Sequence, residues 1–354
     1  MNNYQRGFTM HILTAMKGRS LAVLAALALT LAACAGGGPG DTPSDTPADE
    51  FYKKNTKIEV IGGHDAGSGF DFYMRAVADA IESSSDFSTL VRNIPGGGGL
   101  VGDNELYETT PDGRTIGLLN FPGHAFAQLT DKPSVRYDFA DWEWLGRVAS
   151  GPPVLLVSAD GPYQDVDALA DSGKTVRFSL EEAGSDAYYG AQVSAQVFGF
   201  PAKLITGYEG TSATVAAVIR GETDATFMSY ASALPNIKSG DLKALTVFAA
   251  ETVDAIADVP LATDLVTSDE EKETLTAFGN VYSMERIFVA PPGTPADRVE
   301  YLRKVLADSF EDETFIKKLQ DADRPLNPMP GGEVADAIQA VVDGAASLQK
   351  LLKE

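Results

Sequence analysis

The folded part of this chain alternates apolar runs with segments whose apolar residues recur at helical spacing. Short runs rich in aliphatic residues predict strands at residues 57–61, 90–93, 115–119, 154–157, 176–179, 244–248 and 287–290. Apolar residues three or four positions apart predict helices around residues 74–81, 215–219 and 334–352. Because strands and helices take turns along the chain, we predict an α/β fold built on mainly parallel sheets.

Glycine-rich turns join several predicted strands to helices, and the first of them contains a helix start signal. Ligands of open α/β sheets bind beyond the carboxyl ends of strands, where helix N-termini offer unpaired N–H groups. Ser68 is followed three residues later by Asp71, which fits a capping box with Asp in place of Glu. Two interpretations stay open. The pair caps a helix only, or the amides of residues 67–70 bind a carboxylate while Asp71 orients the loop or accepts a ligand donor.

The second turn carries the glycine spacing of a dinucleotide site. Gly97, Gly99 and Gly102 follow a predicted strand in the pattern Gly-x-Gly-x-x-Gly. The acidic residue expected about 20 positions later is missing from residues 117–122, and no Gly-Lys-Ser or Gly-Lys-Thr follows. We therefore expect close backbone packing at a helix start and no nucleotide cofactor.

Two later turns place short hydroxyl residues directly before predicted helical stretches. Ser185 follows Gly184, and Thr211 and Ser212 follow Gly210. We expect these hydroxyls either to cap helix N-termini or to bind a ligand. A capped helix end can do both, because some of its N–H groups stay free.

The N-terminal region has the features of an export signal. An apolar run follows Lys17 and Arg19, and it is shorter than the roughly 20 residues that a membrane span needs. The run ends in Leu-Ala-Ala-Cys at Cys34, which resembles a bacterial lipobox, whose cysteine is lipidated and becomes the first mature residue. We predict a signal peptide at residues 1–33 and a flexible tether at residues 34–55, with a plain signal peptide as the alternative.

Charge and composition narrow the class of partner. The chain has 50 acidic and 28 basic residues, a formal net charge of −22, which argues against binding to nucleic acid or to anionic lipid headgroups. One cysteine cannot form an intramolecular disulfide, and three histidines are too few for a His-rich or Cys-rich metal site. We expect no metal and no cofactor.

Several short motifs follow one another in a specific order. They lie at residues 66–71, 93–99, 111–115, 208–210, 221–227, 233–240, 258–260 and 290–295. In this order they resemble the extracytoplasmic solute receptors of tripartite tricarboxylate transporters, over most of residues 57–354. The resemblance implies a type II periplasmic-binding-protein-like fold, in which crossing strands join two lobes and a ligand cleft lies between them. It places lobe 1 at residues 56–157 and 284–354, and lobe 2 at residues 158–283.

The same resemblance implies a function and a site. The protein would be a lipid-anchored monomer outside the cytoplasm. It would capture a small carboxylate (a di- or tricarboxylate, an aromatic acid or an amino acid) and deliver it to membrane permease subunits. Carried over by position, the ligand-binding residues are Ala66, Gly67, Ser68, Gly69, Phe70, Asp71, Asn120, Gly123, Gly184, Ser185, Asp186, Thr211 and Ser212.

One stretch departs from the family pattern. The family's loop before the helix of the second lobe is rich in Gly, Ser and Ala, whereas here it carries Glu181, Glu182 and Asp186. These acids would repel an anion unless they point away. We therefore expect a ligand that carries an amine or that is less charged than citrate.

Two other classes of function stay open. A ligand-sensing lipoprotein subunit would have the same fold, and sequence alone does not separate it from a transport receptor. A secreted hydrolase would need a nucleophile with a base, but His64 and His124 are the only imidazoles left after signal removal. Because no Gly-x-Ser-x-Gly motif occurs either, we expect no enzymatic activity.

Overall fold

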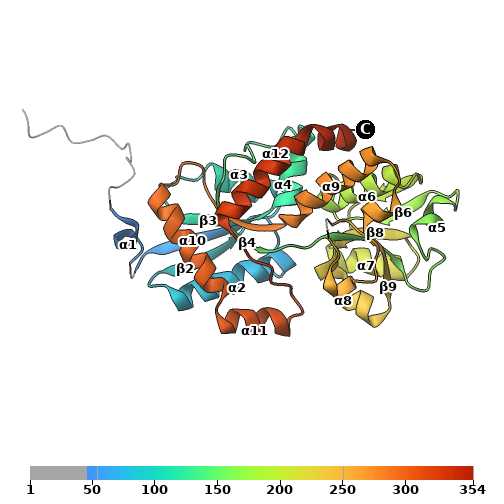
Figure 1. Cartoon of the computed structure of the whole chain (residues 1–354). Coiled ribbons are helices and arrows are strands. Elements are labelled where there is room, and N and C mark those ends of the chain that lie inside the picture. Colours follow the sequence, from blue (N-terminus) through green and yellow to red (C-terminus); the bar gives the residue numbers. More distant parts are fainter. Residues whose placement is uncertain (1–45, 54, 250, 354) are drawn as a thin grey trace, which may run out of the picture. The chain divides into compact units, whose positions relative to one another are not determined.

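The computed structural model describes residues 46–53, 55–249 and 251–353, so the predicted signal peptide and Cys34 lie outside it. Asp45–Glu354 forms one compact unit (Figure 1). The tether expected at residues 34–55 ends earlier than predicted. Helix α1 spans Ala48–Phe51, and Tyr52 is buried and donates a hydrogen bond from its hydroxyl to the Gly113 carbonyl at 2.8 Å. Packing therefore begins about eight residues before the predicted end of the tether, because this aromatic ring joins the core.

Two sheets organise the compact unit. The first has six strands in the order β11-β4-β10-β3-β1-β2. Its strands are β1 (Lys57–Gly62), β2 (Ser88–Asn93), β3 (Thr115–Asn120), β4 (Glu143–Ala149), β10 (Arg286–Ala290) and β11 (Met329–Pro330). Strand β1 is parallel to β2 and β3, whereas β10 is antiparallel to β3 and β4.

The second sheet has five strands in the order β7-β6-β8-β5-β9. Its strands are β5 (Pro153–Ser158), β6 (Val176–Ser179), β7 (Ala202–Ile205), β8 (Ala225–Ser229) and β9 (Leu242–Val247). Strand β6 is parallel to β7 and β8, whereas β5 is antiparallel to β8 and β9. The chain enters this sheet after β4 and returns through helix α9 (Asp269–Ser283) to β10.

The predicted architecture of two α/β sheets is confirmed, with two differences. Both sheets are mixed rather than mainly parallel, because β10 and β5 each lie antiparallel to both of their neighbours. Residues 154–157, which were expected in lobe 1, lie in β5 and pair with the second sheet. The chain therefore changes sheets between Ala149 and Pro153, and not after residue 157.

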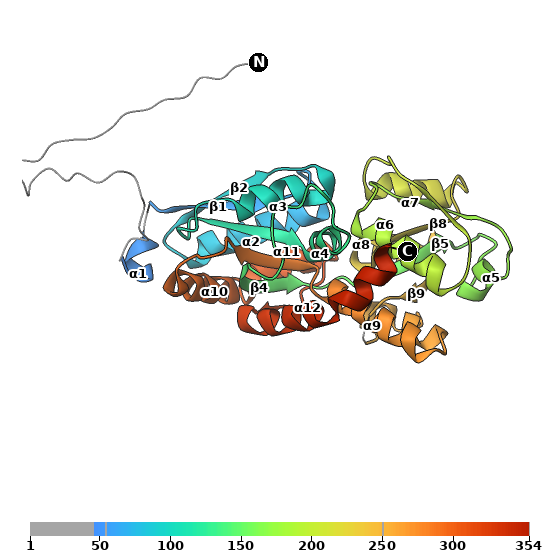
Figure 2. The ribbon, with the colours of Figure 1, turned by 90° about the horizontal axis from the view of Figure 1, so that it is seen from above.

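Helices cover both faces of the first sheet, as Figures 1 and 2 show. One core contains residues of α2 (Gly69–Ser84), α10 (Ala296–Phe310) and α11 (Glu313–Asp321), and the other contains residues of α3 (Leu100–Tyr107), α4 (Phe121–Leu129) and α12 (Gly331–Lys353). Because side chains alternate along a strand, Val60 belongs to the first core and Ile61 to the second.

The second of these cores continues into the second sheet. Phe126 of α4 stacks on Phe278 of α9 with ring centroids 5.4 Å apart, and Phe278 meets Phe248 at 5.8 Å. In the described part of the chain no helix is long and apolar enough to cross a membrane. The remaining elements are α5 (Val166–Ala170), α6 (Asp186–Val197), α7 (Thr211–Ile219), α8 (Tyr230–Ser239) and the short 3-10 helices η1 (Gly97–Gly99), η2 (Asp254–Ile256) and η3 (Ala262–Leu265).

Candidate functional site

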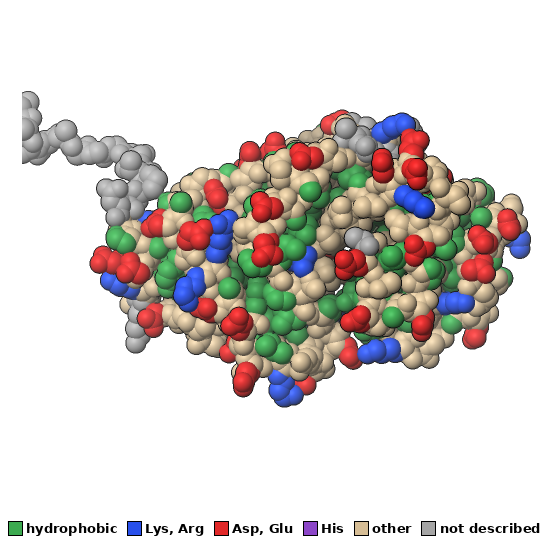
Figure 3. Space-filling view, in the orientation of Figure 1, with side chains coloured by type: hydrophobic (Ala, Val, Ile, Leu, Met, Phe, Trp, Pro, Cys, Tyr) green, Lys and Arg blue, Asp and Glu red, His purple; other side chains and the backbone are tan. Residues whose placement is uncertain are grey.

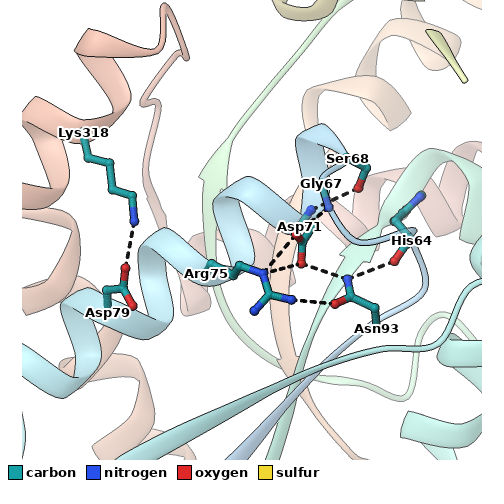
Figure 4. Close-up of polar contacts among 8 residues, drawn as sticks. All are labelled: His64, Gly67, Ser68, Asp71, Arg75, Asp79, Asn93 and Lys318. Atoms are coloured by element: carbon teal, nitrogen blue, oxygen red, sulfur yellow. Dashed lines mark hydrogen bonds and ion pairs between the residues drawn. The ribbon is translucent and has the colours of Figure 1, made fainter.

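The loop between β1 and α2 is held in shape by one buried carboxylate, as Figure 4 shows. Asp71 accepts hydrogen bonds from the Gly67 amide at 2.7 Å and from Asn93 Nδ2 at 2.9 Å, and it forms an ion pair with Arg75 at 2.9 Å. Burial raises the pKa of Asp71, but the hydrogen bonds from Arg75, Gly67 and Asn93 outweigh it and hold the pKa below its ordinary value. Asp71 is therefore ionised at neutral pH and orients the loop.

Ser68 caps the helix that follows, as its spacing predicts. Its Oγ accepts the Asp71 amide at 3.2 Å. The reciprocal bond of a capping box is absent here, because the Asp71 carboxylate takes the Gly67 amide while the Ser68 amide donates to the Asp65 carbonyl. Ser68 thus caps the helix start, while the Asp71 carboxylate closes the preceding turn.

The glycine-rich segment after β2 packs against this loop. A Cβ on Gly63 would lie 2.5 Å from the Gly99 carbonyl oxygen, and a Cβ on Gly102 would lie 2.8 Å from the Gly63 Cα. Gly99 also has a φ of +101°, which side chains rarely adopt. Close backbone approach therefore accounts for the glycine spacing, as the sequence analysis expected.

Phe70 links the loop to a buried arginine that the sequence analysis missed. The Phe70 ring stacks on His64 with centroids 4.1 Å apart, and the guanidinium carbon of Arg286 lies 4.7 Å from the Phe70 centroid. Arg286 is 1 % exposed and forms an ion pair with the buried Glu285. Burial lowers the pKa of His64 to about 4, partly opposed by Asp103, so this imidazole is neutral at pH 7.

Asn120 stands at the carboxyl end of β3, directly opposite Arg286 in the antiparallel pair. Its side chain lies under the next turn, where a Cβ on Gly123 would approach Asn120 Nδ2 to 3.3 Å. Burial raises the pKa of Asp186, partly opposed by the Ala187 amide and by the Asn120 side chain, so the Asn120 amide lies close to the start of helix α6. Asn120 therefore lies where loops from both sheets meet.

Ser185 and Thr211 differ in their roles. Ser185 Oγ accepts the Tyr188 amide at 3.2 Å and caps α6, as one of the two interpretations predicted. The N-cap of α7 is Gly210, so Thr211 and Ser212 lie inside the helix and the capping expected of them is wrong. Thr211 Oγ1 instead donates to Glu181 at 2.9 Å, and Ser212 is exposed.

Acidic side chains gather where the loops face one another, and Figure 3 shows others spread over the surface. Burial raises the pKa of Glu181, and the charges of Asp186, Asp65 and Glu182 raise it further, partly opposed by the Thr211 hydrogen bond. Asp65 belongs to the β1–α2 loop, so like charges oppose one another from the two sheets. The structure thus brings the expected loops at residues 66–71 and 184–186 close to Asn120. Thr211 is linked to this group by its hydrogen bond to Glu181.

The pair Glu285 and Arg286 occupies the segment that leads from α9 back to the first sheet. There is no room for a side chain on Gly151, because a Cβ there would overlap the Glu285 carboxylate and Ser229 Oγ. Burial raises the pKa of Glu285 to about 7, with the Asp186 charge adding and the Arg286 charge opposing. The only sequence signal for this site is a charged pair directly before an apolar strand.

The contribution of Glu285 to stability is expected to fall as the pH rises from about 4.5 to about 7. In that window the folded protein keeps a proton that the unfolded chain has already released, so raising the pH favours unfolding. Glu285→Gln keeps the shape of the protonated carboxyl and should remove this part of the pH dependence. Urea unfolding at a series of pH values checks this, and an unchanged slope in the variant would contradict it. Asp71 titrates at lower pH, and His64, whose pKa is lowered to about 4, changes stability in the opposite direction in both proteins, so the difference between them isolates Glu285.

His124 has no free nitrogen with which to act as a base. The side chain is 1 % exposed, its Nδ1 lies 3.1 Å from Asp103 Oδ2, and its Nε2 accepts the Trp142 indole N–H at 2.8 Å. Both ring nitrogens of His124 therefore contact buried side chains of the core. Among the described residues, no group of three or more His, Cys, Asp or Glu side chains could hold a metal ion.

A cavity of about 730 Å³ lies away from these loops. It is lined mainly by residues of α9 and α12, among them Glu270, Glu271 and Glu273. None of the ligand-binding residues expected from the sequence lines it.

Comparison with known proteins gives one family and one fold. The sequence model of the tripartite tricarboxylate transporter family receptor matches residues 73–352. BugT of Bordetella pertussis is 25 % identical over 213 residues, which cover 59 % of this chain and 65 % of BugT, slightly less than two thirds of its length.

Two solved structures from Rhodopseudomonas palustris share the fold. MatC with bound malate has a TM-score of 0.66 and 17 % identity, over 84 % of this chain and 99 % of MatC. Rpa4515 with adipate has a TM-score of 0.68 and 18 % identity, over 84 % of this chain and 98 % of Rpa4515.

Proposed function

Because the chain belongs to the receptors of the tripartite tricarboxylate transporter family, we propose that it captures a small carboxylate outside the cytoplasm and passes it to membrane permease subunits. MatC was solved with malate and Rpa4515 with adipate, and both of these ligands are carboxylates. The proposed site lies between the loops of the two sheets, at the residues expected from the sequence.

The N-terminus of α2 is the observation that carries this proposal. The N–H groups of Gly69 and Phe70 have no hydrogen-bond partner among the described residues. Free amides at a helix N-terminus, together with the helix dipole, favour an anion. Positive charge stands close by, because Arg286 lies against Phe70 and Arg324 Nη1 would be 3.5 Å from a Cβ on Gly69. A ligand carboxylate would therefore find donors and favourable charge at this point.

Native mass spectrometry tests the proposal. The protein would be purified from an exporting bacterial host without added ligand, then denatured so that any released molecule can be identified. We expect a small organic acid. A released nucleotide would contradict the proposal, and so would an empty protein that no carboxylate stabilises in a thermal-shift screen.

We also propose that lipid on Cys34 anchors the protein to the membrane, based on the lipobox-like residues that precede it. Replacing Cys34 by serine should move most of the protein from the membrane fraction to the soluble extracytoplasmic fraction, because no other anchor is proposed. Fractionation followed by immunoblotting measures this. A Cys34→Ser protein that stays with the membranes as fully as its parent would contradict lipid attachment.

A further inference from the structure

The guanidinium of Arg286 has one occupied edge and one free edge. Its Nη1 donates to the Glu285 carboxylate, whereas no group among the described residues accepts a hydrogen bond from Nε or Nη2. The Nε atom is buried without a partner. A buried donor without an acceptor costs free energy, and this cost is recovered when an acceptor binds. The edge formed by Nε and Nη2 therefore lacks a partner.

Other arginines of this protein use the same edge to bind a carboxylate. Arg177 donates from Nε and from Nη2 to the two carboxylate oxygens of Asp224, at 2.9 Å each. Arg220 does the same with Glu222, at 2.8 and 3.2 Å. This arrangement is strong and specific, because two parallel hydrogen bonds join two planar charged groups. A carboxylate is thus the group that fits the free edge of Arg286.

Arg286 lies against the first turn of α2, where the carboxylate site is proposed. Its guanidinium carbon is 4.7 Å from the ring centroid of Phe70 and 4.9 Å from that of Tyr73. These two rings and the ion pair with Glu285 hold the guanidinium in place, so its free edge is already oriented. Because Arg286 is 1 % exposed, an ion pair formed there is little weakened by water. The same burial means that a ligand enters only when the loops of the two sheets separate.

We propose that Arg286 is a ligand-binding residue, and that its Nε and Nη2 donate to the two oxygens of the ligand carboxylate beside the free amides of α2. This inference rests on the proposed function and adds a fully charged side chain to a site made of backbone amides. Glu285 stays in place, because it uses Nη1 at the other edge. A carboxylate is favoured over a neutral amide, since an amide offers only one acceptor oxygen and no opposite charge.

The Nε–H resonance of Arg286 tests this contact in the wild-type protein. Succinate, malate, adipate and benzoate are titrated by calorimetry into dialysed protein, and proton–nitrogen NMR spectra are recorded without and with each acid that binds. We expect the Nε–H proton signal of Arg286 to move downfield, because a charge-assisted hydrogen bond forms. Arg177 and Arg220 are internal controls whose Nε–H signals should stay in place, since their edges are already occupied. The signal of Arg286 is assigned by its absence from the spectrum of Arg286→Lys.

Arg286→Lys also tests the effect on affinity. Lysine keeps the charge and can still pair with Glu285, but it has no planar edge with two donors. We expect the dissociation constant of the bound acid to rise roughly ten-fold or more, as the loss of a charge-assisted hydrogen bond predicts. Arg220→Lys is the matched control, because it makes the same change at an exposed arginine that is paired with Glu222. It should leave binding unchanged. If Arg286→Lys does not fold, the wild-type NMR signal decides alone.

Three outcomes overturn the proposal. If an acid binds while the Nε–H signal of Arg286 does not move, Arg286 does not contact the ligand, and the receptor function stands. The same conclusion follows if Arg286→Lys folds and binds that acid as tightly as the wild type. If none of these acids binds, the proposed function fails together with this inference.

Discussion

Gly102→Ala is expected to lower the free energy of unfolding by about 3 kcal/mol, the upper part of the range for overpacking. Alanine would normally gain about 1 kcal/mol over glycine within a helix. Here its Cβ would lie 2.8 Å from the Gly63 Cα and 3.0 Å from the Ile94 carbonyl oxygen. These neighbours are backbone atoms and cannot rotate away, so β1 and α3 must separate. Urea unfolding measures the loss, and ligand titration should show weaker binding because Gly63 opens the loop that is proposed to bind the carboxylate.

Gly344→Ala is the control for this prediction. Gly344 lies within α12, and a Cβ there would meet no atom within 4 Å. The same substitution should therefore stabilise the protein by up to about 1 kcal/mol. If both variants are equally stable, the close approach of Gly102 to Gly63 does not constrain the fold.

Local sequence pattern predicted an element correctly where the contacts that form this element lie close together in the sequence. The strand predicted at residues 176–179 has the observed bounds, and the capping of α2 by Ser68 follows from its spacing to Asp71. In both cases the deciding contacts lie within a few residues or follow from continuous apolar character. The order of short motifs likewise identified the family.

Elements that depend on distant partners were missed. Strand β4 contains Arg147, a residue typical of surfaces, but here Arg147 is buried and donates to the Ser283 carbonyl at 2.9 Å and to the Asn327 carbonyl at 3.1 Å. These acceptors come from the end of α9 and from the segment before β11. The burial of β4 is therefore set by how the chain returns from the second sheet, which no local window contains.

The burial of the pair Glu285 and Arg286 was missed because it too depends on distant parts of the chain. Charged residues before an apolar strand usually lie at the surface. These two are buried because β10 inserts between β3 and β4, which places Arg286 opposite Asn120. The sequence could indicate which loops bear the site, but it could not show that a buried ion pair lies behind Phe70.

Asp71→Ala is expected to lower the free energy of unfolding by about 3 kcal/mol and to weaken ligand binding more than ten-fold. Removing the carboxylate leaves the Gly67 amide and Asn93 Nδ2 without their acceptor, and hydrogen bonds to charged groups contribute roughly 1.5–3 kcal/mol each. Arg75 is half exposed and can be hydrated instead, so its ion pair adds little. Binding falls because the Gly67 turn, which precedes the free amides of α2, loses its shape. Urea unfolding and calorimetry measure the two effects.

The contribution of Asp71 should also depend on pH in a defined direction. Its pKa is lowered in the folded protein, so the stabilisation is present above the ordinary value of 3.8 and is lost as the pH falls below it. Asp79→Ala is the matched control in the same helix, because Asp79 is 70 % exposed and pairs with Lys318 at the surface (Figure 4). It should cost no more than about 1 kcal/mol and leave binding unchanged. Equal losses from the two variants would mean that Asp71 does not organise the loop.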